Sequence, residues 1–241
     1  MRRALMTTLL LLAFPAAADA ATVKVVDCVP SLDPAARTAT FEARMGAARG
    51  SQRMQVRFTL QVREPALGVW RKVAASGFDS WLTSMAGVRR YSYSKTVTNL
   101  TAPSAYRTIV RFRWLDADGD VVKSARVTSA RCRQPDLRPD LEPRRVDVLA
   151  TTDPDTRRYA VAVRNAGRTD ALPFAATLRI GADEPLPVAV LGLPAGIQRI
   201  VTFTAPPCTA GSQLTVTLDP GEAVDERDED DNVLVTPCPE P

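Results

Sequence analysis

The stretch Tyr-Arg-Thr-Ile-Val-Arg-Phe-Arg-Trp, residues 106–114, alternates between two sets of side chains along its whole length. One set is Tyr106, Thr108, Val110, Phe112 and Trp114, and the other is Arg107, Ile109, Arg111 and Arg113. A period of two is typical of a β-strand that buries one face and exposes the other. The stretch therefore predicts a half-buried strand with an arginine-rich outer face.

A second stretch shows the same period within residues 55–63. Its apolar positions are Val56, Phe58, Leu60 and Val62, with polar side chains between them. Asp-Ala-Asp-Gly-Asp at 116–120 leads from the first stretch into a strand-like run at 121–127. Asp-Gly between two such runs predicts a β-hairpin. The five residues also resemble the start of a calcium loop, but Val121 and Val127 replace the required Gly and Glu.

Shorter strands are predicted around these stretches, at 22–28, 38–44, 69–74 and 91–98. Residues 76–90 contain two glycines and Trp81, and we interpret them as a loop or a single helical turn. No long helical period occurs in the sequence. Short strands separated by turns predict a β-sandwich for this part of the chain.

A composition change after Cys132 marks a domain boundary. Three prolines stand among charged residues in 135–145, which favours extended backbone and predicts a short, semi-rigid linker. The linker separates a domain at 21–134 from a second at 146–241. Strand-like runs in the second domain fall at 146–150, 158–164, 174–180, 187–191, 198–204, 213–218 and 232–236. The predicted fold class is all-β, with two immunoglobulin- or fibronectin-like β-sandwich domains in tandem.

The first twenty residues have the three parts of a secretory signal peptide. Arg2 and Arg3 precede a short apolar run, and Ala18-Asp19-Ala20 forms an A-x-A cleavage site. The apolar run is shorter than the ~20 residues of a spanning helix, and no second run of that length follows. We therefore expect residues 1–20 to be cleaved and the protein to be secreted into the extracellular space, with no membrane span.

The four cysteines are expected to form disulfides, because exported proteins enter an oxidising compartment. Cys28 and Cys132 bracket the first domain, whereas Cys208 and Cys238 lie near the end of the second. Of the three possible connectivities we predict Cys28–Cys132 and Cys208–Cys238. Free buried cysteines and a metal site are the alternatives, but the chain has no C-x-x-C spacing and no histidine to support zinc.

Charge divides at the same boundary. Residues 21–134 carry 19 basic and 8 acidic residues, and residues 135–241 carry 10 basic and 18 acidic residues. The overall net charge of +4 thus hides a basic domain followed by an acidic one. A basic domain attracts polyanions, although the charges also serve simply to keep each domain soluble.

The second domain carries a family pattern. Its parts occur in the order Pro-Asp-Leu at 139–141, Val-Ala-Val-Arg-Asn-Ala-Gly-Arg-Thr at 161–169, Leu-Pro-Ala-Gly at 193–196, Val-Thr-Phe at 201–203, Leu-Asp-Pro-Gly-Glu-Ala-Val-Asp-Glu at 218–226 and Glu-Asp-Asp-Asn at 229–232. Roughly residues 136–236 thereby resemble the CARDB domain, a bacterial cell-adhesion-related module with a fibronectin-like sandwich fold. The resemblance implies an extracellular interaction or spacer module. The extra Cys208–Cys238 pair and Asp231, where a first Asn of an Asn-Asn pair is expected, depart from the pattern.

No catalytic site and no cofactor are predicted. Without histidine, Ser-His-Asp and Cys-His arrangements are impossible. A carboxylate pair of the glycosidase kind remains conceivable, but the acids fall in turns, the linker and one run at 225–232. That run suggests a Ca²⁺ site held by Asp225, Glu226, Asp228 and Asp230. A solvated loop, with Asn232 as a turn residue, is the preferred reading, so no metal site is predicted.

The arginines between the apolar positions form the main candidate binding face. If the strands at 55–63 and 106–114 share a sheet, the side chains that project together are Arg57, Arg63, Arg107, Arg111 and Arg113. Like charges opposite one another are destabilising, so such a face has either acidic partners or an anionic ligand. Four aromatic residues are a further candidate, as a sugar-stacking platform or as ordinary packing residues: Trp70, Trp81, Tyr91 and Tyr93.

The leading hypothesis is a secreted, non-enzymatic adhesion or binding protein. Its basic domain would contact an anionic envelope component, and its CARDB-like domain would be a spacer or second contact. The expected partner is an extracellular polyanion, glycan or protein; nucleic acid is disfavoured by export. The alternatives are a structural unit that self-associates through its oppositely charged domains and a carbohydrate-active accessory protein. The sequence identifies neither the ligand nor the oligomeric state.

Overall fold

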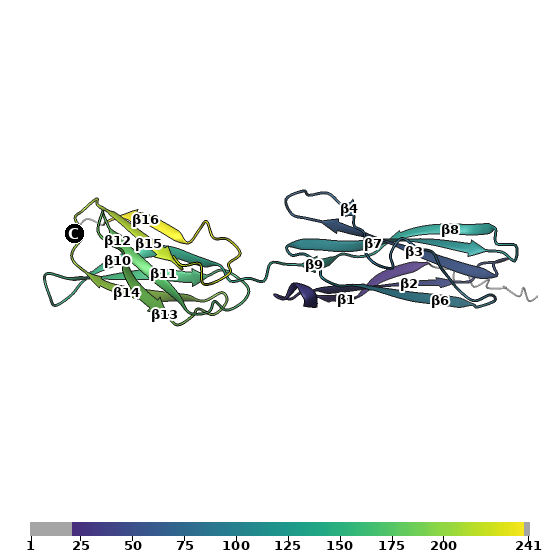
Figure 1. Cartoon of the computed structure of the whole chain (residues 1–241), viewed down its shortest axis with the longest axis horizontal. Helices are drawn as coiled ribbons and strands as arrows, with labels where there is room; N and C mark the ends of the chain where they lie inside the picture. Colours follow the sequence, from purple (N-terminus) through teal and green to yellow (C-terminus); the bar gives the residue numbers. More distant parts are fainter. Residues whose placement is uncertain (1–20, 239–241) are drawn as a thin grey trace, which may run out of the picture. The chain divides into compact units, whose positions relative to one another are not determined.

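The computed structural model describes residues 21–238 and divides the chain into two compact units. The first unit contains residues up to Val29 together with Pro34–Gln134, and the second contains Pro30–Asp33 and residues from Pro135 onward. The predicted signal peptide, residues 1–20, lies outside the described residues. Figure 1 shows each unit as two layers of strands. The all-β fold class is therefore confirmed.

The first unit pairs its strands into two sheets. One sheet has the order β1-β2-β6, and the other has the order β4-β3-β7-β8, with β5 on β3 and β9 on β7. The strands are β1 (Thr22–Val29), β2 (Thr38–Gly46), β3 (Arg53–Arg63), β4 (Arg71–Lys72), β5 (Leu82–Thr83), β6 (Arg90–Val97), β7 (Ser104–Leu115), β8 (Val121–Thr128) and β9 (Cys132–Gln134). Between β1 and β2 lies a short 3₁₀ turn, η1 (Pro34–Ala36). Residues 76–90 form turns around β5 and no helical turn.

The core of this unit is built from the predicted apolar positions. Val56, Phe58, Val110 and Phe112 are all at most 1% exposed, as the period of two requires. The buried indole of Trp114 donates from Nε1 to the carbonyl of Gly46 at 2.6 Å, which joins β7 to β2 across the two sheets. Because the apolar side chains of β3 and β7 are buried in this core, the arginine-rich faces of the two strands are turned outward.

The predicted hairpin at 116–120 is confirmed as the connection between β7 and β8. Asp116 accepts hydrogen bonds from the backbone N–H groups of Asp118 and Asp120 at 3.1 and 2.9 Å. Gly119 has a φ of 94°, which L side chains rarely adopt. The carboxylate of Asp116 therefore stabilises the turn.

The second unit is also a two-layered sandwich. Its sheets have the orders β10-β11-β14 and β13-β12-β15-β16. The strands are β10 (Leu141–Ala150), β11 (Arg157–Asn165), β12 (Phe174–Ile180), β13 (Leu186–Val190), β14 (Gln198–Ala205), β15 (Gln213–Leu218) and β16 (Val233–Pro237). Tyr159, Val161 and Phe203 are at most 1% exposed and belong to its core. The seven predicted strand regions correspond to these seven strands within the described residues.

Strand β10 begins at Leu141, inside the segment 135–145 that the sequence predicts to be a linker. Leu141 is fully buried in the core of the second unit, and Pro143 is buried beside a register shift between Pro143 and Arg145. A proline has no N–H for the ladder and is tolerated at such irregularities. The predicted linker at 135–145 is therefore wrong in its second half, because these prolines do not prevent strand formation.

Both disulfides join the cysteines that the sequence pairs. Cys28 is bonded to Cys132 with a Cα–Cα distance of 5.5 Å, and Cys208 is bonded to Cys238 with a Cα–Cα distance of 6.1 Å. Each bond lies within one unit. Within residues 21–238, no helix is long and apolar enough to cross a membrane.

Candidate functional site

The outer face of the larger sheet of the first unit carries a row of arginines. Arg57 on β3 pairs directly with Arg111 on β7, and Arg111 pairs directly with Arg126 on β8. Residues paired across antiparallel strands have Cβ atoms about 4.5–5.5 Å apart. Three positive side chains therefore lie side by side across three adjacent strands. We call this set the arginine row.

Two tryptophans lie against the arginines of this face. The guanidinium groups of Arg57 and Arg113 lie 4.7 and 4.2 Å from the ring centre of Trp81. Arg107 lies 4.1 Å from the ring centre of Trp70. An arginine this close to an aromatic ring is in cation–π contact, which contributes about 0.5–1 kcal/mol at an exposed site. The tryptophans thus orient the arginines without neutralising them.

The arginine row has few negative neighbours. Among the residues that the structure describes, no carboxylate lies within salt-bridge distance of Arg57, Arg111 or Arg126. Burial opposes ionisation of the nearby Asp79, but hydrogen bonds from Thr59 and Lys72 and the charges of Lys72 and Arg57 lower its pKa. Asp79 forms its salt bridge with Lys72 at 3.0 Å. Nε of Arg57 is buried and has no hydrogen-bond partner among residues 21–238.

An open groove of about 640 Å³ runs along the same face. It is lined by Trp81, Arg111, Phe112, Arg113, Val121, Ser124, Ala125 and Arg126. Three arginines and an indole therefore border one groove that contains no acidic residue. A second cavity of the first unit, of about 420 Å³, has Glu64 as its one acidic lining residue. Neither cavity holds the carboxylate pair that a glycosidase requires.

The sequence located most of this face but not all of it. All five predicted arginines lie on the predicted face of one sheet, and Arg63 is exposed at the end of β3 opposite Ala105. Arg126 was missed, although the Asp-Gly hairpin places the run at 121–127 beside β7. The register of that hairpin is the signal that would have found it.

The four aromatic residues do not form one platform, and the packing alternative holds for two of them. Trp70 and Trp81 lie against the arginines, but Tyr91 and Tyr93 lie on β6 in the other sheet and pack against the core of the unit. The two tyrosine rings have centroids 6.4 Å apart. They therefore belong to the packing, because alternate residues of one strand face the same side.

In the second unit, residues of the CARDB-like sequence pattern form hydrogen bonds with one another. The side chain of Asn165, fully buried at the end of β11, accepts hydrogen bonds from the N–H groups of Asp140 and Gly167 and donates to the carbonyls of Thr169 and Leu193. The four distances lie between 2.9 and 3.1 Å. Asn165 thus connects the start of β10 to two further turns.

Gly167 is required for a different reason. A Cβ atom at this position would lie 2.5 Å from the carbonyl oxygen of Arg138 and from the Cα of Pro139. Such an approach forces the backbone to shift, since the neighbouring atoms are backbone rather than flexible side chains. The Asn-x-Gly turn therefore packs closely against the segment that precedes β10.

The acidic residues at the end of the CARDB-like pattern also serve mainly to hold loops of the fold in place. Asp219 accepts a hydrogen bond from the N–H of Val224 at 2.7 Å. Glu226, which is 1% exposed, accepts from the N–H of Leu141 and from the side chain of Asn232. Asp225 forms a salt bridge with Arg138 at 2.7 Å. The sequence offered Asp225 and Glu226 as calcium ligands, but both hold the loop to the segment around β10.

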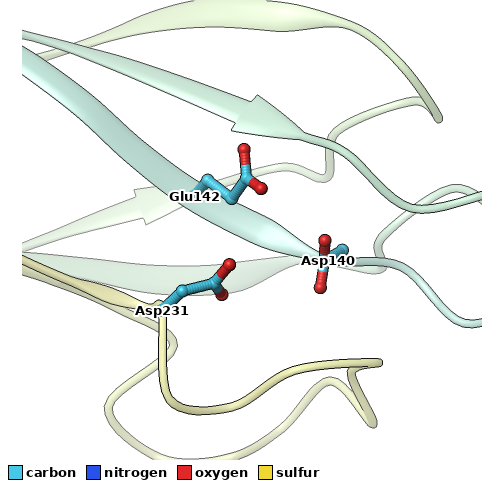
Figure 2. Close-up of side chains that lie close together, drawn as sticks. All are labelled: Asp140, Glu142 and Asp231. Atoms are coloured by element: carbon cyan, nitrogen blue, oxygen red, sulfur yellow. The ribbon is translucent and has the colours of Figure 1, made fainter.

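The described residues contain one group of three close acidic side chains, Asp140, Glu142 and Asp231 (Figure 2). One carboxylate oxygen from each lies within 4.8 Å of the others. Asp140 and Glu142 share a face because they are two residues apart at the start of β10, and Asp231 precedes β16. Asp228 and Asp230, the other two residues of the calcium alternative that the sequence disfavoured, are exposed and do not belong to this group. The sequence missed Asp140 and Glu142 because they lie in its predicted linker.

Burial and crowding shift several carboxyl pKa values in this region. Burial raises the pKa of Asp140, and the negative charges of Asp228 and Asp136 add to the rise, while Arg227 opposes it. Burial also raises the pKa of Asp231, together with the charges of Asp140 and Asp228. Burial raises the pKa of Glu226 to about 7, against hydrogen bonds from Leu141 and Asn232 that lower it.

Glu226 is expected to make the second unit less stable as the pH rises. Its pKa is about 7 in the fold and 4.5 as the ordinary value, so the stability that it contributes is complete below pH 4.5 and is lost as the pH rises through 7. Between pH 5 and 8 this costs about 2–3 kcal/mol. Glu226→Gln should remove this loss, measured by comparing hydrogen exchange of β10 amides in the two proteins at each pH.

The control for this experiment is Glu184→Gln, which removes an exposed carboxyl from the same unit. It should follow the wild type at every pH. If Glu226→Gln and the wild type lose stability in parallel between pH 5 and 8, the carboxyl of Glu226 is not the group that titrates.

Comparison with known families and structures follows the division into units. Residues 134–236 match the CARDB family model. This part of the chain is a CARDB domain. The match begins at the end of β9 and reaches into β16, so the CARDB domain includes the two pattern turns and the acidic group.

Solved structures with similar folds include other CARDB domains. A domain of a Methanosarcina acetivorans protein is 23% identical, covers 42% of this chain and 91% of that chain, and has a TM-score of 0.37. The CARDB domain of a Pyrococcus furiosus protein in complex with di-metal ions is 21% identical, with coverage of 42% and 88% and a TM-score of 0.36. The class 5 fimbriae chaperone CfaA is 11% identical, with coverage of 91% and 100% and a TM-score of 0.26. No curated protein matches the sequence of this chain.

The CARDB domain indicates an extracellular, adhesion-like function. CARDB domains and immunoglobulin-like sandwiches are typically non-catalytic. The two disulfides are consistent with an extracellular location.

Proposed function

We propose that the protein is a secreted, non-enzymatic binding protein whose first unit contacts an anionic envelope component through the arginine row. The CARDB domain then serves as a spacer or as a second contact. The observation that carries the proposal is the register of Arg57, Arg111 and Arg126 across three strands without a carboxylate in salt-bridge distance among the described residues.

Electrostatic self-repulsion is the physical reason for assigning a ligand to this face. Directly opposed like charges destabilise a sheet by roughly 0.2–1 kcal/mol for each pair. A polyanion that binds across the three strands replaces this repulsion with attraction. The fork of donors on each guanidinium suits carboxylate, sulfate and phosphate groups.

The groove beside the arginine row favours an anionic glycan among the polyanions. Trp81 is in cation–π contact with both Arg57 and Arg113 and borders the groove. The indole gives the groove an apolar border that a sugar ring can contact, while the neighbouring arginines meet the acidic groups of the sugar. The partner proposed here is therefore an acidic envelope polysaccharide.

Neutralising two arginines of the row should weaken retention on acidic polysaccharide. We expect Arg111→Gln combined with Arg126→Gln to reduce the affinity for immobilised alginate about tenfold at low salt, because each lost charge removes about 0.7 kcal/mol of screened attraction. The wild type should itself elute as salt is raised, since exposed charges are screened over about 8 Å at physiological ionic strength.

The matched control is Arg89→Gln combined with Arg90→Gln. It removes the same charge from the same unit but not from the larger sheet, since Arg89 precedes β6 and Arg90 begins it. Equal loss in both double variants would show diffuse attraction to net charge rather than a binding face. Retention that does not change between low and high salt would contradict the proposal altogether.

Self-association is the second candidate, favoured by the opposite net charges of the two units. It predicts oligomers at low ionic strength that dissociate as salt is added, whereas the binding proposal predicts a chain that stays monomeric without ligand. Size-exclusion chromatography at two salt concentrations distinguishes them.

A further inference from the structure

The acidic group of the CARDB domain contains oxygens that lack any partner. Oδ1 of Asp140 and Oδ1 of Asp231 are both buried and accept no hydrogen bond within the described part of the chain. Asp140 is 0% exposed. A buried carboxylate oxygen without a donor or cation is costly, so Oδ1 of Asp140 indicates room for a further positive partner beside the one that its other oxygen already has.

Two arginines form salt bridges with the acidic group, and each binds only one of the two oxygens of its carboxylate partner. Arg227 forms its salt bridge with Oδ2 of Asp140, and Arg144 forms its salt bridge with Oε2 of Glu142. Among residues 21–238 no arginine or lysine forms a salt bridge with Asp231. The arginines therefore leave one oxygen on each carboxylate available.

The backbone around the group is fixed by bonds outside it. The N–H of Asp140 donates to Asn165, and the N–H of Arg227 donates to the carbonyl of Pro139 at 2.9 Å. Asn232, next to Asp231, donates to Glu226 at 3.1 Å. The carboxylates are thus held close together by the fold, and Figure 2 shows Glu142 and Asp231 directed to the side where Asp140 lies.

The geometry points to a Ca²⁺ site formed by Asp140, Glu142 and Asp231. Calcium takes oxygen ligands at about 2.3–2.6 Å, so the oxygens around a single ion lie at most about 4.6–5.2 Å apart. One oxygen from each of these three carboxylates lies within 4.8 Å of the other two. Water would supply the remaining positions of its shell. The bound ion would join the start of β10 to the loop before β16 in a second way, beside Arg227. This site is independent of the proposed polyanion face, which lies in the other unit.

Titration calorimetry of the whole chain with CaCl₂ in about 0.15 M NaCl tests the site. We expect one saturable site with a Kd of about 10⁻⁴–10⁻³ M, the range of extracellular modules. Asp231→Asn and Glu142→Gln should each weaken it at least about tenfold, because each removes one of three charged ligands. Asp231→Asn is the cleaner change, since Oδ1 of Asp231 accepts no hydrogen bond among the described residues, whereas Glu142 forms a salt bridge with Arg144. MgCl₂ should bind more weakly, because magnesium demands a near-ideal octahedron and gives up its water reluctantly.

Asp230→Asn is the matched control, because it removes the same charge from the adjacent, exposed residue. It should bind Ca²⁺ like the wild type. The site is refuted if the wild type shows no saturable binding up to about 10 mM, a concentration ten times the weakest expected Kd. It is equally refuted if Asp230→Asn and Asp231→Asn lose binding to the same extent, which would indicate diffuse counter-ions. Loss of Ca²⁺ binding would leave alginate retention unchanged, so the two proposals fail separately.

Discussion

Asn165→Ala is expected to destabilise the CARDB domain by about 4 kcal/mol. The substitution removes four hydrogen bonds at once from a side chain that is 0% exposed. Two of the four partners, the N–H groups of Asp140 and Gly167, would then be left without their acceptor, and each unpaired buried group costs about 1–3 kcal/mol. Hydrogen exchange of β10 and β11 amides in the whole chain measures the loss.

Two controls separate this effect from general damage. Thr169→Val removes a single hydrogen bond nearby, from the Thr169 hydroxyl to the carbonyl of Leu137 at 2.7 Å, and should cost about 1 kcal/mol. The three tryptophans, Trp70, Trp81 and Trp114, all lie in the first unit, so tryptophan fluorescence should report an unchanged unfolding transition there. A loss no larger for Asn165→Ala than for Thr169→Val would show that water replaces the amide.

The alternation of apolar and polar side chains with a period of two predicted most of the fold. In β3 and β7 it identified the buried and outward positions correctly, because a strand half in water must alternate. It failed at the start of β10, where Pro139 and Pro143 indicated a linker. Proline limits hydrogen bonding but not burial, and Leu141 lies in the core between the two prolines.

The arginine row was only partly predictable. The arginines of β3 and β7 follow from their positions along each strand, but the pairing of Arg57 with Arg111 depends on register, which distant parts of the chain determine. The position of Trp81 against Arg57 and Arg113 depends on how residues 76–90 fold over the sheet. No local pattern encodes such a contact.

The acidic group was the least predictable feature. A run of acids is most often a solvated loop, and most of this run is exposed. Only Asp231 points to the acids of β10, because Glu226 and Asn232 hold the loop against that strand. The chemistry arises from tertiary contacts between segments far apart in the sequence, whereas the sequence reasoning considered neighbours within one run.

Removing the Cys28–Cys132 disulfide is expected to destabilise the first unit by more than removing the Cys208–Cys238 disulfide destabilises the second unit. The bonded residues are 104 positions apart, against 30 for Cys208–Cys238. On the chain-entropy model, closing these loops stabilises by about 4.7 and about 3.7 kcal/mol. Cys28→Ala with Cys132→Ala should therefore lower the free energy of unfolding of the first unit by about 4–5 kcal/mol, measured by urea unfolding with tryptophan fluorescence.

Alanine is the better replacement because Cys132 is 1% exposed, and a serine hydroxyl there would add the cost of burying a polar group. The Cys208→Ala, Cys238→Ala protein is the control, and its tryptophan transition should match the wild type because all three tryptophans lie in the other unit. Hydrogen exchange of β15 and β16 should reveal its own smaller loss. If removing Cys208–Cys238 lowered the free energy of unfolding more than removing Cys28–Cys132, the entropy of the unfolded chain would not be the main source of stabilisation. Lost packing of the sulfurs against each core would then be the explanation to test.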